Sequence, residues 1–225
     1  MSKMGYGYGS EFQLLRYLGH HRNYLDKQIM VKTGSISPIQ WYDHPINRKT
    51  SSYDAELKDI ECFKDELFFE ELRVKWGKFW PQRGNSQNWD AVFRQNDTWY
   101  FVEAKAHISE VHKKCSAKEH CGKPKILQAF ISTCNGNKTL AEQWLESDCY
   151  QLANRLAFIH FCKENGIKAK LCLICFISGY NANPTKEVLD NETWNELWRE
   201  EFRKLSLTDK QKKDILQINI DCLKG

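Results

Sequence analysis

Two short segments decide the fold: NWDAV at residues 88–92 and FVEAKAH at residues 101–107. Each pattern predicts a β-strand, and Asn96-Asp97 between them suits a hairpin turn. A hairpin centred on this turn pairs residues whose numbers sum to 193. Asp90 is therefore expected directly opposite Glu103, at the distance of cross-strand neighbours.

Glu103 and Lys105 should share one face of their strand, because side chains alternate, and Ala104 should point to the opposite, helix-packed face. Two carboxylates at Asp90 and Glu103 repel each other unless a cation lies between them, and a hard ion such as Mg²⁺ prefers oxygen ligands. Beside such an ion, Lys105 could orient or help deprotonate a water, or act as a fixed cation. These parts suit phosphodiester hydrolysis. The alternative is an exposed strand pair, since acidic-x-Lys triplets are common.

The rest of the chain predicts an α/β sandwich with a mixed sheet. Helical spacing is seen at 11–18, at 54–76 in one or two pieces, and at 194–205. Helix starts are predicted at Thr139 and at Asp148, and a strong helix runs through Leu152 to Gly166. Strand-like patterns are seen near 39–42, at 79–80, at 170–178 and at 215–223. Between these segments, 20–53 looks irregular and 107–137 looks like a long polar excursion. The run at 170–178 is nearly all apolar, as expected of a central strand covered on both faces.

At the two deciding segments the chain resembles the PD-(D/E)XK nuclease superfamily, which includes restriction endonucleases and Holliday junction resolvases. The resemblance covers roughly residues 10–180, with Trp89 where a proline often precedes the aspartate. It implies a restriction-endonuclease-like αβββαβ core with Asp90, Glu103 and Lys105 as the catalytic centre. The implied protein is a Mg²⁺- or Mn²⁺-dependent nuclease acting on DNA. We expect a single domain over 1–225, with the core motif at 78–178 and a C-terminal helix and strand at 190–225.

The resemblance implies two further site residues. Gln151 stands where many members carry a polar residue on the helix after the lysine, although it could equally be a helix-capping residue. Glu11 corresponds to the glutamate that reaches the metal site from the first helix of resolvases. It also precedes leucines at +3, +4 and +7, which predicts an inward-facing position. The rival for this fourth acid is Glu70 or Glu71.

Weaker candidate site residues follow this motif in the sequence. His107 follows the motif on the same face and could touch phosphate or simply end the strand. The basic stretch 112–125 includes Lys113 and Lys114, which could bind DNA phosphates or form a solvated face. A zinc-like set within it, His112, Cys115, His120 and Cys121, has awkward spacing for one tetrahedral site.

Composition sets only broad limits. The net charge is +4, hydrophobic residues make up 41% and charged residues 28%, which indicates a soluble globular protein. The start of the chain lacks the apolar run of a signal peptide, and no segment suits a membrane span. We therefore expect a cytoplasmic protein whose nine cysteines are free thiols, mostly in the core. The open alternatives are a nucleic-acid-binding protein with a relic nuclease site and a zinc-dependent interaction module. A homodimer is also left open.

Overall fold

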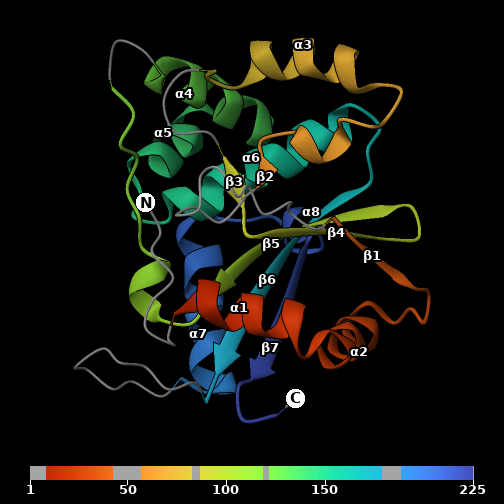
Figure 1. The fold of residues 1–225 in the computed structure, drawn as a ribbon. Coiled ribbons are helices and arrows are strands. Elements are labelled where there is room, and N and C mark those ends of the chain that lie inside the picture. Colours follow the sequence, from red (N-terminus) through yellow and green to blue (C-terminus); the bar gives the residue numbers. More distant parts are fainter. Residues whose placement is uncertain (1–8, 43–56, 83–86, 119–121, 179–188, 225) are drawn as a thin grey trace.

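A computed structural model describes residues 9–42, 57–82, 87–118, 122–178 and 189–224. Its centre is a mixed five-stranded sheet in the order β1-β4-β5-β6-β7 (Figure 1). The strands are β1 (Ile39–Trp41), β4 (Ala91–Gln95), β5 (Thr98–Lys105), β6 (Ala169–Ile177) and β7 (Ile215–Asp221). The chain is thus an α/β protein, as its sequence predicts.

The predicted hairpin register is confirmed. β4 and β5 run antiparallel, with Ala91 opposite Val102 and Gln95 opposite Thr98. Asn96 in the turn has a φ of 54°, a left-handed conformation that asparagine tolerates better than most residues. β5 then pairs with β6, and β6 with β7, in parallel. β5 and β6 therefore form the middle of the sheet.

Helices cover both faces of the sheet. On one face lie α1 (Ser10–Gly19) and α2 (Arg22–Thr33), whose Leu14, Tyr17 and Leu25 pack with Val102 and Ala104. On the other face lie α3 (Phe69–Phe79), α4 (Lys123–Thr133), α5 (Lys138–Glu146), α6 (Tyr150–Glu164) and α7 (Asn191–Lys204). Odd-numbered β5 side chains face this second layer, and even-numbered ones face α1 and α2.

Several predicted elements are confirmed within a few residues: α1, β1, α5, α6, β6, α7 and β7. Side-chain caps and a glycine define three of the helix ends. The side chain of Asn137 accepts a hydrogen bond from the Leu140 N–H at the start of α5, and Asp190 accepts one from the Thr193 N–H at the start of α7. Gly166, just after α6, has a φ of 77°, which glycine adopts without strain.

Other predictions were wrong. Residues 20–53 contain helix α2, and the excursion at 107–137 contains α4 and the short 3-10 helix η3 (Ile108–Glu110). Of the helical stretch predicted at 54–76, residues 54–56 lie outside the described residues and 69–76 form the first part of α3, as predicted. The part between them is instead the strand β2 (Leu57–Lys58) and the 3-10 helix η2 (Glu61–Phe63). The predicted strand at 79–80 is the end of α3. β2 forms a separate two-stranded sheet with β3 (Asn88–Trp89), and the short helix α8 (Asp209–Lys212) precedes β7.

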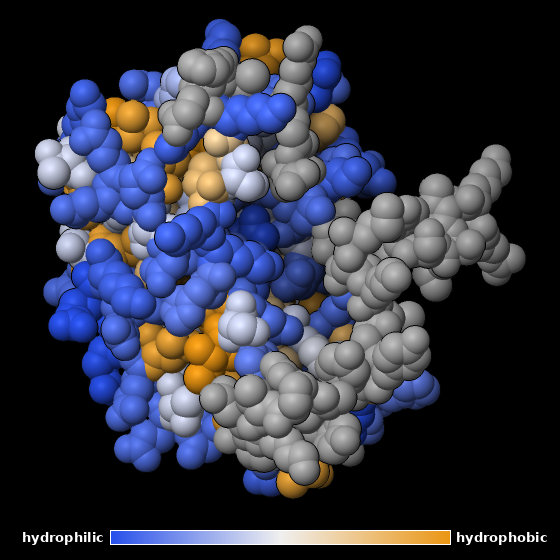
Figure 2. Space-filling view, turned by 90° about the vertical axis from the view of Figure 1, so that its left-hand side faces the viewer, coloured by the Kyte–Doolittle hydropathy of each residue, from blue (hydrophilic) through white to orange (hydrophobic). Residues whose placement is uncertain are grey.

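The cysteine prediction is confirmed for the residues that the structure describes: all eight cysteines there are free, and seven are buried. Within the same segments, no helix combines the length and apolar character needed to cross a membrane. The face of the molecule in Figure 2 is mostly hydrophilic, with a few separate apolar patches.

Candidate functional site

The end of β5 carries the central pair. Glu103 and Lys105 lie on the same strand face, and each is only 4% exposed. The Lys105 ammonium donates a hydrogen bond to Oε1 of Glu103. Ala104 faces the opposite layer with the residues of α1 and α2, as predicted. The pair is therefore buried, which contradicts the alternative of an exposed strand pair.

Asp90 lies at the bend just before β4, beside the end of β5. Its N–H donates to the Val102 carbonyl at 3.2 Å, and its Oδ2 accepts from the Ala104 N–H at 2.7 Å. The bend removes Asp90 from the regular ladder, yet its charge acts directly on Glu103 and Lys105. Asp90 is also the member of the three that retains partial exposure. The structure thus brings the three predicted residues together.

Gln151, at the start of α6, joins this group. Its amide nitrogen donates to Oε1 of Glu103 at 2.8 Å, and its Oε1 accepts from Lys105 Nζ at 3.1 Å. Both contacts arise because α6 packs over the face of β5 that bears Glu103 and Lys105. The N-cap residue of α6 is Cys149 and not Gln151, so the alternative of a capping role is wrong and the Gln151 side chain orients both charged groups.

Arg155 is a site residue that the sequence analysis missed. Its Nε donates to Oε2 of Glu103 at 2.7 Å, and its NH2 donates to the Asn88 carbonyl at 2.7 Å. Its guanidinium also lies 4.6 Å from the centre of the Trp89 ring, within the range of a cation–π contact. One signal was present in the sequence: Arg155 follows Gln151 by four residues, so both share a helix face that is otherwise apolar.

The charges in this group push the two carboxyl pKa values apart. Burial and the nearby Glu103 raise the pKa of Asp90 to about 7, against the opposing effect of Lys105. Burial also favours a higher pKa for Glu103, but Arg155 and Lys105 outweigh it and lower the pKa to about 2. Burial favours a lower pKa for Lys105, yet Glu103 and Asp90 outweigh it and raise the pKa. Glu103 is therefore held as the carboxylate and Lys105 as the ammonium, whereas Asp90 takes up a proton more readily than an ordinary aspartate.

The fourth acid is less well placed. The start of α1 lies near this end of the sheet, because Ser10 N and Ala106 N both contact the carboxylate of Glu110, at 3.4 and 2.8 Å. Glu11 nevertheless does not complete a group with Asp90 and Glu103. Among the described residues, the single group of three Asp, Glu, His or Cys side chains with ligand atoms within 4.8 Å of one another lies elsewhere.

The rivals of Glu11 lie on the outside of α3. Glu70 pairs with Arg73 at 2.7 Å and Glu71 with Lys75 at 2.6 Å, and both glutamate side chains are more than 70% exposed. Such pairs along a helix surface are ordinary solvated contacts. Glu11 thus remains the better candidate of the three.

The predicted phosphate-binding residues follow β5 but do not form a compact patch. His107 caps η3, since its Nδ1 accepts from the Ser109 N–H at 3.1 Å. Lys113 and Lys114 are exposed. Further along, Lys123 pairs with Glu146 at 2.8 Å and Lys125 donates to the Gly77 carbonyl at 2.5 Å. Lys113 and Lys114, together with the exposed Lys118, therefore stay candidates for phosphate contacts among the described residues of this stretch.

The zinc-like set is only partly described. His120 and Cys121 lie outside the described residues. His112 Nε2 lies 3.2 Å from Oε1 of Glu201 on α7, whereas Cys115 hydrogen-bonds to the Tyr150 side chain. His112 and Cys115 thus have different partners.

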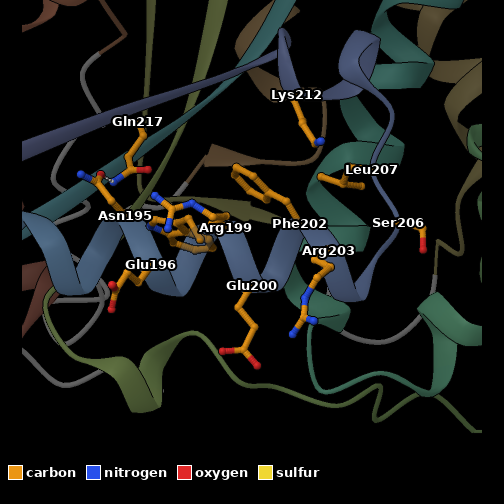
Figure 3. Close-up of a pocket in the computed structure, with 11 residues that line it drawn as sticks. Asn195, Glu196, Arg199, Glu200, Phe202, Arg203, Ser206, Leu207, Lys212 and Gln217 are labelled. Atoms are coloured by element: carbon orange, nitrogen blue, oxygen red, sulfur yellow. Dashed lines mark hydrogen bonds between the residues drawn. The ribbon is translucent and has the colours of Figure 1, made fainter.

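A surface pocket lies away from the acidic group. It encloses about 790 Å³ and is lined by side chains of α7, α8 and β7. Arg199, Phe202 and Gln217 surround it (Figure 3). Its lining includes none of Asp90, Glu103 and Gln151.

Three comparisons, with protein-family models, with curated proteins and with solved structures, find no match for this chain.

Proposed function

We propose that the chain is a Mg²⁺- or Mn²⁺-dependent nuclease that hydrolyses phosphodiester bonds in DNA. The observation that carries this proposal is the convergence of Asp90, Glu103 and Lys105 at the end of β5, with the two carboxyl pKa values pushed apart. Such a separation is typical of catalytic carboxylates. The preference for DNA comes from the resemblance to PD-(D/E)XK enzymes, since the residues alone imply only a phosphodiester and a metal.

The order of elements supports the same proposal. In chain order, α1, β1, β4, β5, α6 and β6 follow the pattern αβββαβ, with β4 and β5 antiparallel and β5 and β6 parallel. This is the arrangement that the resemblance implies. The helices α3, α4 and α5 are then insertions around the core, and α7 with β7 extends it.

The donor set fits a hard divalent cation. Asp90 and Glu103 offer carboxylate oxygens, the ligand type that Mg²⁺ and Mn²⁺ favour. Burial and, next, the charge of Glu103 raise the pKa of Asp90, and a cation between the two carboxylates would relieve their repulsion. Because Glu103 is already held by Lys105, Gln151 and Arg155, Asp90 is the more accessible ligand.

In this proposal each residue has a distinct role. A bound divalent ion neutralises charge on the phosphate and lowers the pKa of a coordinated water. Lys105 is held protonated by its neighbours and therefore acts as a fixed cation toward the developing charge, not as a proton acceptor. Gln151 orients Lys105 and Glu103 together, and Arg155 fixes the second oxygen of Glu103.

The test is incubation with linear, circular and branched DNA in the presence of Mg²⁺ or Mn²⁺. Wild-type protein should cleave at least one substrate, and Lys105→Ala should not. Lys168→Ala is a matched control, because the Lys168 side chain is 70% exposed and lies at the far end of the sheet. Full activity of Lys105→Ala would refute the role of that lysine. No cleavage of any substrate with any metal would favour the relic-site alternative.

A further inference from the structure

A second cluster of metal-binding side-chain types lies between the start of α6 and the middle of α7. Asp148, Cys149 and Glu201 place one ligand atom each within 4.8 Å of one another. His112 reaches the same carboxylate from the segment after η3, with its Nε2 3.2 Å from Oε1 of Glu201. Three side chains thus meet at one point, and His112 approaches the other oxygen of the Glu201 carboxylate from a third segment.

Burial makes Glu201 the centre of this cluster. It is 0% exposed on a helix whose neighbouring positions face solvent, and Cys149 is 1% exposed. The Cys149 thiol donates to Oε2 of Glu201, and Lys204 Nζ lies 2.8 Å from Oε1. A buried carboxylate requires such partners. The carboxylates of Asp148 and Glu201 carry two negative charges, and the Lys204 ammonium carries one positive charge. With His112 and the Cys149 thiol both uncharged, one negative charge in the cluster is therefore not balanced.

A Zn²⁺ ion would balance these charges. With the Cys149 thiolate, Asp148 and Glu201 as ligands and Lys204 beside them, the sum is zero. Zinc takes thiolate, imidazole and carboxylate ligands together, unlike Mg²⁺, which prefers oxygen alone. This donor set therefore points to zinc, not to the ion proposed for the acidic site.

Two of the spacings between donor atoms already suit a zinc ion. Cys149 Sγ lies 3.4 Å from Oδ1 of Asp148, and His112 Nε2 lies 3.2 Å from Glu201. Tetrahedral zinc with ordinary bond lengths places its ligand atoms about 3.3–3.6 Å apart. Binding one ion with all four ligands requires the exposed His112 to move toward the other three. It also requires Lys204, whose side chain is 34% exposed, to leave Oε1 of Glu201.

We propose that Asp148, Cys149, Glu201 and His112 form a structural zinc site. Four protein ligands leave no open position, which is typical of structural and not catalytic zinc. The ion fixes α7 and the segment after η3 to the start of α6, the helix that carries Gln151 and Arg155. This site does not depend on the proposed nuclease activity. It also differs from the set expected from spacing alone, with which it shares only His112.

The test uses the full chain, stripped with EDTA and then titrated with zinc or cobalt. Wild-type protein should hold one zinc ion per chain, and the cobalt form should show a thiolate-to-metal charge-transfer band. His112→Ala and Cys149→Ser should each weaken zinc binding more than about 100-fold, because even residues behind the ligands account for 10–100-fold. The cobalt band should disappear in Cys149→Ser.

Matched controls separate this site from the others. Cys134→Ser alters another buried cysteine, Cys115→Ser alters the set expected from spacing, and Asp90→Asn alters the proposed catalytic site. All three should keep the tight zinc. Absence of stoichiometric zinc in wild type, or normal zinc affinity in Cys149→Ser, would overturn the proposal. If Cys115→Ser loses zinc and Cys149→Ser keeps it, the metal belongs to the set expected from spacing, which contains Cys115. The cobalt spectrum of wild type needs no variant, so the proposal stays testable even where a variant fails to fold.

Discussion

Replacing Asp90 by asparagine should stabilise the metal-free protein, and more so at higher pH. The folded-state pKa of this carboxyl is raised from 3.8 to about 7, so the folded protein binds its proton more tightly than the unfolded chain. The tighter proton binding of Asp90 in the folded protein contributes to the unfolding free energy in full below pH 3.8, and this contribution is lost as the pH rises through about 7. The whole loss corresponds to about 4 kcal/mol. Asparagine keeps an oxygen that can accept from the Ala104 N–H and never ionises.

The difference in unfolding free energy between Asp90→Asn and wild type should therefore grow by about 2–3 kcal/mol between pH 5 and pH 8. Urea denaturation in EDTA, followed by the fluorescence of the eight tryptophans, measures it directly. Asp97→Asn, at an exposed turn position, is the matched control and should show no such change. Saturating Mg²⁺ should reverse the order at pH 8, because only wild type gains a full ligand set. A difference that is equal at both pH values would refute the charge conflict at Asp90.

Three further outcomes are expected. Arg155→Met should lower the unfolding free energy by about 3–5 kcal/mol, because it removes the guanidinium that pairs with the buried Glu103 carboxylate. An effect below about 1 kcal/mol in urea denaturation would contradict this. Neutralising Lys113 and Lys114 together should reduce the slope of log binding constant against log salt by about 2 for duplex DNA, and an unchanged slope would return both lysines to a solvated face. Glu11→Gln should raise the Mn²⁺ concentration needed for half-maximal cleavage if this glutamate reaches the metal, which a metal titration of initial rates decides.

The hairpin and its residues could be predicted because their signals are local. Strand alternation, a short turn and a fixed register are enough to place Asp90 opposite the end of β5. The long apolar run at 170–178 predicts the central strand β6 just as directly. What the alternation does not reveal is the bend at Asp90, which depends on the separate pairing of β2 with β3.

Misleading periodicity explains the errors at 54–76. Leu67 and Val74 contribute to the apparent apolar line of a helix, yet both are exposed, while Leu72 and Trp76 form the buried face of α3. Helix α2 was missed for the opposite reason: only Leu25 and Ile29 are buried in it, so the pattern is too sparse to detect.

Contacts between distant segments explain what was missed at the sites. Arg155 meets Glu103 across 52 positions, and His112 meets Glu201 across 89. No spacing rule connects residues so far apart in the chain. They become visible only when α6 and α7 pack against the same face of the sheet.

The central claim is that Glu103 and its neighbours form a metal-dependent phosphodiesterase site. The most direct measurement is the initial rate at which circular duplex and single-stranded DNA are cleaved, with Mn²⁺ and with EDTA, by wild type and by Glu103→Gln. Glu70→Gln, which changes an exposed glutamate on α3, serves as the control. Wild type and Glu70→Gln should cleave only when metal is present. Glu103→Gln should lose at least about 100-fold in rate, as expected when a residue essential to the transition state is altered. Equal rates for Glu103→Gln and wild type, or cleavage that persists in EDTA, would contradict it.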